Sequence, residues 1–208
     1  VIFLTFLKIS DILLVTYLGL GEYLVYRHSK IYGYDVQPNQ KIKRRGKIVT
    51  INDLGMRSLK NWSNNYDMKI LFIGDSVTFG GSIVNDENTF SEKICDNISD
   101  IRVVCGNYAV NGFGIEAITK RIKYRNFSDE DLIIVTLIGN DFERGFSNLD
   151  FQPFYTKKIS NFFPAFTELV FIILDKIRIK IKYNFKNISE DVKVFDKYKF
   201  DQSANLIK

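Results

Sequence analysis

Histidine and cysteine are scarce in this sequence, which contains one of the first and two of the second. Cys95 and Cys105 form no C-x-x-C motif and no Cys/His cluster, so the sequence signals neither a metal site nor a disulfide framework. Two buried thiols are the favoured interpretation, and a single disulfide in an oxidising compartment is the alternative. The one histidine, His28, precedes every predicted core element, and we expect it at the surface.

The net charge of +5 comes from a basic excess that is spread along the chain. Motifs that would place a basic helix or an aromatic platform on a nucleic acid are lacking, so we predict no nucleic-acid partner. The densest basic run comprises Lys41, Lys43, Arg44, Arg45 and Lys47. A solvated loop is the favoured interpretation of this run, and contact with anionic lipid headgroups is the alternative.

The first thirty residues are rich in apolar side chains. Within them, Ile9–Tyr26 is long enough to approach a bilayer span, although Asp11 and Glu22 are costly there. A membrane anchor over residues 1–28 is favoured over an amphipathic packing helix. Residues 29–66 are polar, basic and rich in Asn and Gly, and we expect a lead-in outside the core.

Residues 67–208 have the pattern of one α/β domain, for which a chain of 208 residues has room. Short apolar runs predict buried strands over 69–73, 101–108 and 132–138, and 47–51 could add an edge strand. Helical spacing predicts helices over 89–98 and 115–122, the first with a capping box between Thr89 and Glu92. Alternating strands and helices predict a doubly wound, mostly parallel sheet.

The C-terminal part of the sequence is harder to assign. Apolar residues between Phe163 and Leu174 fit one face of a helix. From Lys176 to Lys186 apolar and polar residues alternate as in a strand, and the pattern leaves open whether the helix continues through this stretch.

Ser76, Gly112 and Asn140 each follow the carboxyl end of one of the three predicted strands. Ligands of doubly wound sheets bind at this edge. A serine on the turn after a strand exposes its hydroxyl as a nucleophile, while its own N–H can help to hold an oxyanion. Ordinary turn and capping chemistry explains each of these residues when it is taken alone.

Taken together and in order, these segments resemble the SGNH/GDSL family of serine hydrolases. The resemblance lies in GDSVTFG from Gly74, NYAVNG from Asn107 and GND from Gly139, and Asn52–Arg57 (NDLGMR) is similar to the lead-in of some membrane-linked members. It implies a flavodoxin-like fold with Ser76 as nucleophile. It also implies oxyanion donors from the Ser76 and Gly112 N–H groups and the Asn140 amide, with no cofactor or metal.

Two departures from the family pattern stand out. Ile138 takes the place of a glycine in the third block, and the final Asp-x-x-His block, which supplies the general base, does not occur. Asp196 and Asp201 have no histidine three residues later, and we expect the missing block, with the last core elements, after Lys208.

The predicted function is ester hydrolysis through an acyl-enzyme, on acyl esters of cell-envelope glycans or lipids. The alternatives are a membrane-tethered pseudo-hydrolase that serves as a binding module, and a glycan O-acyltransferase. The resemblance to envelope-acting members favours a membrane-associated, extracytoplasmic location. The basic residues on the domain side of the anchor favour the opposite orientation.

Overall fold

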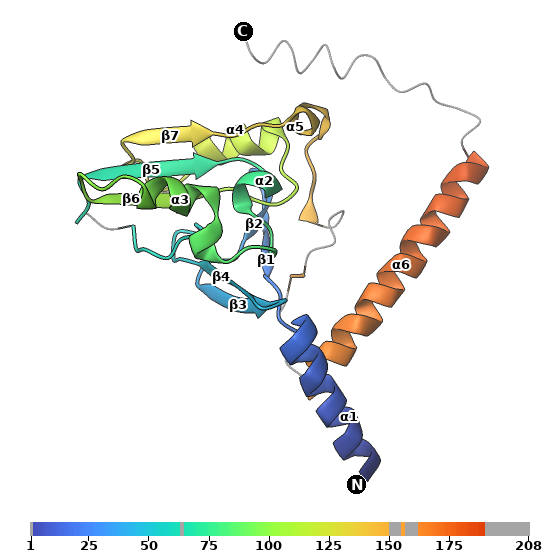
Figure 1. Ribbon diagram of the computed structural model, residues 1–208. Helices are drawn as coiled ribbons and strands as arrows, with labels where there is room; N and C mark the ends of the chain where they lie inside the picture. Colours follow the sequence, from blue (N-terminus) through green and yellow to red (C-terminus); the bar gives the residue numbers. More distant parts are fainter. Residues whose placement is uncertain (1, 63–64, 150–154, 157–161, 190–208) are drawn as a thin grey trace.

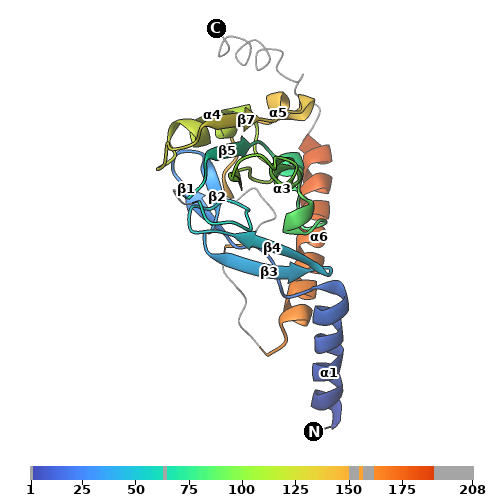
Figure 2. The ribbon, with the colours of Figure 1, turned by 60° about the vertical axis from the view of Figure 1, so that its left-hand side comes forward.

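The computed structural model describes residues 2–62, 65–149, 155–156 and 162–189. Its core is a parallel sheet of three strands in the order β6-β5-β7, flanked by helices (Figures 1 and 2). The strands are β5 (Met68–Ile73), β6 (Val103–Asn107) and β7 (Leu132–Val135). The α/β class and the three parallel strands are therefore confirmed. β7 ends three residues earlier than predicted and is half-exposed, so it forms an edge of the sheet in the described part of the chain.

Both faces of the sheet are covered, because consecutive side chains of β5 point in opposite directions. Ile70 and Phe72 pack with Cys95 of α3 (Phe90–Asp96). Leu71 and Ile73 pack with Ile118 of α4 (Ile115–Lys123) on the other face. The two helices thus lie on opposite faces, which is the arrangement of a doubly wound sheet.

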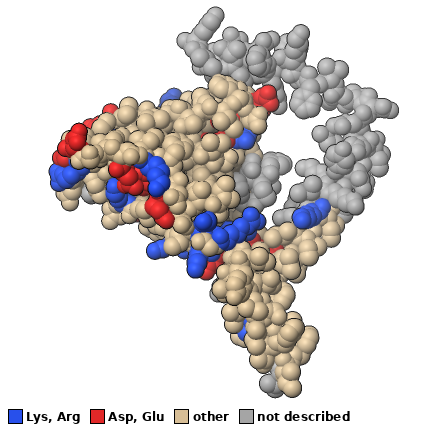
Figure 3. Space-filling model, viewed as in Figure 1, with Lys and Arg blue, Asp and Glu red and all other residues tan. Residues whose placement is uncertain are grey.

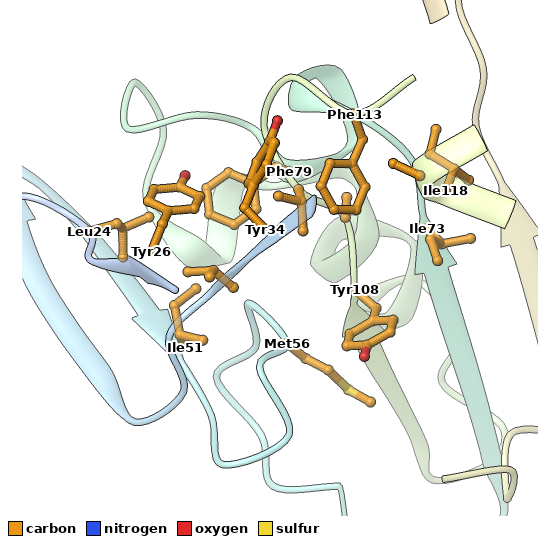
Figure 4. Close-up of a cluster of buried hydrophobic side chains, with 14 of the residues drawn as sticks. Leu24, Tyr26, Tyr34, Ile51, Met56, Ile73, Phe79, Tyr108, Phe113 and Ile118 are labelled. Carbon is orange, nitrogen blue, oxygen red and sulfur yellow. The ribbon is translucent and has the colours of Figure 1, made fainter. Parts of the chain in front are cut away.

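Two antiparallel hairpins precede this sheet and complete its larger core cluster (Figure 4). The strands are β1 (Tyr26–Ser29) with β2 (Gly33–Val36), and β3 (Gln40–Arg44) with β4 (Lys47–Ile51). Tyr34, Val36, Val49 and Ile51 are almost completely buried in the cluster. The strand over 47–51 is confirmed, but the expectation that residues 29–66 stay outside the core is wrong.

Short helices connect the strands. They are α2 (Ser76–Phe79), the 3₁₀ turn η2 (Asp86–Asn88) and α5 (Gly139–Glu143). α3 begins after Thr89, whose hydroxyl accepts from the Glu92 N–H. The second half of the predicted capping box does not form, because the buried Glu92 carboxylate accepts from the Ser58 hydroxyl at 3.2 Å and the Leu59 N–H at 3.4 Å instead. Burial raises the pKa of Glu92.

Cys95 and Cys105 form a disulfide that joins α3 to β6, with 5.9 Å between their Cα atoms. The favoured interpretation of two free thiols is therefore wrong, although both residues are buried as expected. The pairing depends on α3 folding back over β6, which the ten-residue spacing does not reveal.

The N-terminal apolar segment is divided in the structure. α1 (Ile2–Leu13) continues as a π-helical turn, η1 (Leu14–Leu18), and ends at Gly19, where φ is 63°. The chain then enters the domain, where Leu24 and Tyr26 belong to the core. Residues 9–26 are thus not one apolar helix, and none of the described helices is both long and apolar enough to cross a bilayer.

The last described helix, α6 (Pro164–Ser189), starts beside α1 and leads away from the sheet (Figure 1). It runs through residues 176–186, so the alternating pattern there lies within a helix. Asp196 and Asp201 lie outside the described residues.

Candidate active site

Ser76 stands at the first position of α2, directly after the central strand β5. Asp75 caps this helix, because its Oδ1 accepts from the Val77 N–H at 2.8 Å. The Ser76 hydroxyl is partly exposed and donates to Asp75 Oδ2 at 3.3 Å. Gly74 makes the sharp turn possible: a Cβ atom there would lie 2.3 Å from Thr78 Oγ1. This turn presents the hydroxyl at the carboxyl edge of the sheet.

The loops with Gly112 and Asn140 follow the two strands that flank β5. Gly112 has a φ of 79°, a conformation that favours glycine. The turn before it is held by the Tyr34 hydroxyl, which donates to the Asn111 carbonyl at 2.8 Å. Asn140 is exposed in α5. In Figure 1 the arrowheads of β5 and β7 point toward α2 and α5, so the three predicted residues lie past neighbouring strand ends, as expected.

Backbone hydrogen bonds continue the sheet just beyond the strands and tie these loops to the turn of Ser76. The Val110 N–H donates to the Gly74 carbonyl at 3.1 Å, and the Thr136 N–H donates to the Ile73 carbonyl at 2.9 Å. The loops that follow β6 and β7, the strands on either side of β5, are therefore fixed relative to Ser76.

Arg144, which the sequence did not single out, connects all three loops through one nitrogen atom. Its Nη1 donates to Asp75 Oδ2 at 3.0 Å, to Asp141 Oδ1 at 3.2 Å and to the Phe113 carbonyl at 3.2 Å. Gly114 allows this close approach, because a Cβ atom there would lie 2.4 Å from the Arg144 carbonyl oxygen. The guanidinium thus compensates two buried carboxylates beside the candidate nucleophile.

Asp141 is fully buried, and its carboxylate also accepts from the Ile138 N–H at 2.9 Å. Burial raises the pKa of Asp141, and the neighbouring Asp75 carboxylate raises it further, against the Ile138 N–H and Arg144, which lower it. The Asp of the predicted G-N-D block thus has a structural role, since it anchors the start of α5 beside Asn140.

Arg57 organises the loop that follows α2. Its buried guanidinium pairs with Asp86 at 2.8 Å and donates to the carbonyls of Phe79 at 2.8 Å, Gly81 at 2.7 Å and Val84 at 2.7 Å. Asn107, from the second motif, holds the same helix by donating to the Thr78 carbonyl at 2.7 Å. The NDLGMR stretch was the sequence signal for Arg57, although not for its role.

An open and mainly apolar depression of about 520 Å³ lies between α2, this loop and α3. Ser76 lines it together with Val77 and Ile83, which are 53% and 72% exposed. A hydrophobic group bound next to the hydroxyl of Ser76 would therefore find apolar contacts here.

The described residues place no histidine near Ser76 that could act as a general base. His28 is exposed on β1, where it pairs with Tyr34 of β2, and it lies outside the three strand-end loops. The surface position expected for it is confirmed. Within the described ranges, no cluster of three or more His, Cys, Asp or Glu side chains has the geometry to hold a metal ion.

Comparisons of the chain with family models, with curated proteins and with solved structures found no match. The geometry of the site is therefore the basis for proposing a function.

Proposed function

We propose that the protein is a serine ester hydrolase that forms an acyl-enzyme on Ser76. The observation that carries the proposal is the placement of Ser76 on a tight turn after the central strand, between the loops of Gly112 and Asn140. The strand order corresponds to the 2-1-3 arrangement of flavodoxin-like sheets, in which ligands bind where the order reverses. This arrangement is what the SGNH resemblance implies.

In the proposed reaction the Ser76 hydroxyl oxygen attacks the acyl carbonyl and passes its proton to a base. The Ser76 N–H has no acceptor within α2, because it lies in the first turn. It can therefore stabilise the oxyanion together with the Gly112 N–H and the Asn140 amide. Collapse of the tetrahedral intermediate releases the alcohol, and water then hydrolyses the acyl-enzyme by the same steps.

Asp75 is a poor candidate for the base, because its two carboxylate oxygens already accept from the Val77 N–H and from Arg144. The SGNH resemblance implies a histidine for this role, and His28 lies outside the strand-end loops. Without such a base the hydroxyl stays protonated, and activity falls by several orders of magnitude.

The test is labelling with a fluorophosphonate probe, measured on folded protein from the complete reading frame. We expect modification of Ser76, loss of labelling in Ser76→Ala and normal labelling in the control Ser82→Ala, because Ser82 lies in the loop after α2. If Ser76 stays unmodified in a folded protein, the hydrolase proposal is wrong. That result would instead favour a binding module without catalytic activity, the function suggested by a strand-end edge without histidine.

The substrates that we propose are acyl esters of cell-envelope glycans or lipids, and glycan O-acyl transfer is the variant with a sugar as acceptor. The Cys95–Cys105 disulfide supports an extracytoplasmic location, because disulfides persist in oxidising compartments. Incubation with an acetylated glycan, with and without a second glycan, separates the reactions. Free acetate as the sole product would rule out transfer.

A further inference from the structure

The N-terminal helical segment, residues 2–18, exposes most of its apolar side chains. Ile2, Phe3 and Leu4 are 88%, 70% and 58% exposed, and consecutive positions of a helix differ by about 100°. Phe6 and Ile12, further along, are also exposed. An exposed apolar surface of this extent marks a site of contact with a membrane or with another protein, and the views in Figures 1 and 2 both show α1 leading away from the domain.

The charged residues that would oppose insertion of this segment into lipid are compensated within the protein. Asp11 is buried and accepts from the Phe166 N–H at 3.0 Å. Lys8 donates to the Phe162 carbonyl and lies 4.2 Å from the centre of the Phe162 ring. Glu22, just after the segment, accepts from the Lys43 N–H at 2.7 Å. The free-energy cost of placing Asp11 and Glu22 in or near a membrane is therefore reduced.

A basic hairpin turn lies at the domain end of the same segment. Gly19, which ends η1, contacts it so closely that a Cβ atom would lie 2.3 Å from the backbone N of Arg45. Arg44 fixes the junction by donating to the Gly19 carbonyl at 3.3 Å and by pairing with the buried Glu168 at 2.7 Å. Figure 3 shows blue Lys and Arg side chains gathered just above α1.

The basic residues left for an external partner are Lys41, Lys43, Arg45 and Lys47, which have no ion pair among the described residues. A band of positive charge thus borders the apolar segment on its domain side. This sequence of apolar and cationic surfaces matches the acyl chains and the headgroups of an anionic lipid layer.

We propose that residues 2–18 insert into one leaflet of an anionic bilayer, while the basic hairpin turn contacts its headgroups. α1 and η1 together have 17 residues and are therefore about 25 Å long, which is shorter than the roughly 30 Å of the hydrocarbon core. The inference does not depend on the chemistry of Ser76. Charge selects lipid over a second copy of the chain, since the same basic turn on a symmetric partner would repel.

The experiment is flotation of the full chain with vesicles of phosphatidylcholine, with and without phosphatidylglycerol, at about 0.15 M salt. We expect binding to the anionic vesicles. The triple variant Lys41→Gln, Lys43→Gln, Lys47→Gln should bind about 100-fold more weakly, because each basic residue near the surface contributes about fivefold. The control variant Lys93→Gln, Lys120→Gln, Lys123→Gln removes the same number of charges, but from α3 and α4. It should bind as tightly as the wild type.

A second variant, Phe3→Ser with Phe6→Ser, should lose binding to the anionic vesicles while its circular dichroism and thermal midpoint stay unchanged. The headgroup contact would be overturned if the wild type bound neutral and anionic vesicles equally well and the triple variant bound as tightly as the wild type. Absence of vesicle binding in a folded chain would overturn the proposal altogether. If light scattering then showed a dimer that the Phe variant dissociates, the helix would be covered by a second copy.

Discussion

Replacing Arg144 with methionine tests whether one guanidinium holds the strand-end loops together. Methionine keeps much of the aliphatic packing but leaves Asp75 and Asp141, both almost fully buried, without their cation. Removing one partner of a buried ion pair costs about 3–5 kcal/mol. Since the Arg144 side chain is 33% exposed, solvent screens part of this effect, and we expect a loss of about 2–3 kcal/mol near pH 7.

The loss should depend on pH in a defined direction. Burial raises the pKa of Asp141, so the folded state binds its proton more tightly than the unfolded chain does. Stability then falls as pH rises from the ordinary pKa of 3.8 through the raised value. Without Arg144 the pKa of Asp141 rises further. The difference between variant and wild type should therefore be smallest near about pH 4 and largest near about pH 7.

Urea unfolding followed by circular dichroism at both pH values measures this difference. Asp141→Asn in the Arg144→Met background should recover part of the lost stability near neutral pH, because it removes one uncompensated charge. Arg102→Met is the control, since Arg102 pairs with Asp67 at the exposed surface and should change the free energy of unfolding little. A loss that is identical at the two pH values would refute the electrostatic explanation.

Three further predictions concern the core around the site. Cys95→Ala with Cys105→Ala should lower the free energy of unfolding by about 2–3 kcal/mol, and reductant should destabilise wild type but not this variant. Burial raises the pKa of Tyr26 to about 12, so the folded state holds the phenol proton more tightly than the unfolded chain does. Stability should therefore fall above pH 10 by up to about 1.4 kcal/mol per pH unit. In urea unfolding, Tyr26→Phe should show a smaller loss of stability over this alkaline range. Gly74→Ala should destabilise by about 1–3 kcal/mol or more, whereas Gly145→Ala, where a Cβ atom would meet nothing within 4 Å, should melt like wild type.

The parts of the fold that the sequence predicted are those whose signal is local. β5 was evident because six consecutive residues, Met68–Ile73, include a continuous apolar run that ends at Gly74. α4 was evident from apolar residues repeating at helical spacing. The positions of Ser76, Gly112 and Asn140 followed from these elements, because parallel strands bring their carboxyl ends to one edge.

The lead-in was misjudged because its buried polar groups are compensated by residues far along the chain. Asp35 lies in β2 and is 2% exposed, a burial that a carboxylate tolerates only with a partner. That partner is Arg121 of α4, at 2.6 Å, and Arg27 adds a second contact at 3.3 Å. Read locally, Asp35 marks a polar loop, and no periodicity in the sequence reveals a cation 86 residues away.

Partners that lie far apart in the sequence also explain why only part of the candidate site was predicted. A motif identifies residues whose chemistry depends on their neighbours in the chain, such as the serine on its tight turn. Arg57 and Arg144 act instead on carbonyls and carboxylates from several loops. Arg57 can do so because its guanidinium presents donors on three nitrogen atoms in a rigid plane. Lysine in place of Arg57 would lose this geometry while keeping the charge. The form of the edge around Ser76 therefore depends on the two arginines as much as on the motif that presents the hydroxyl.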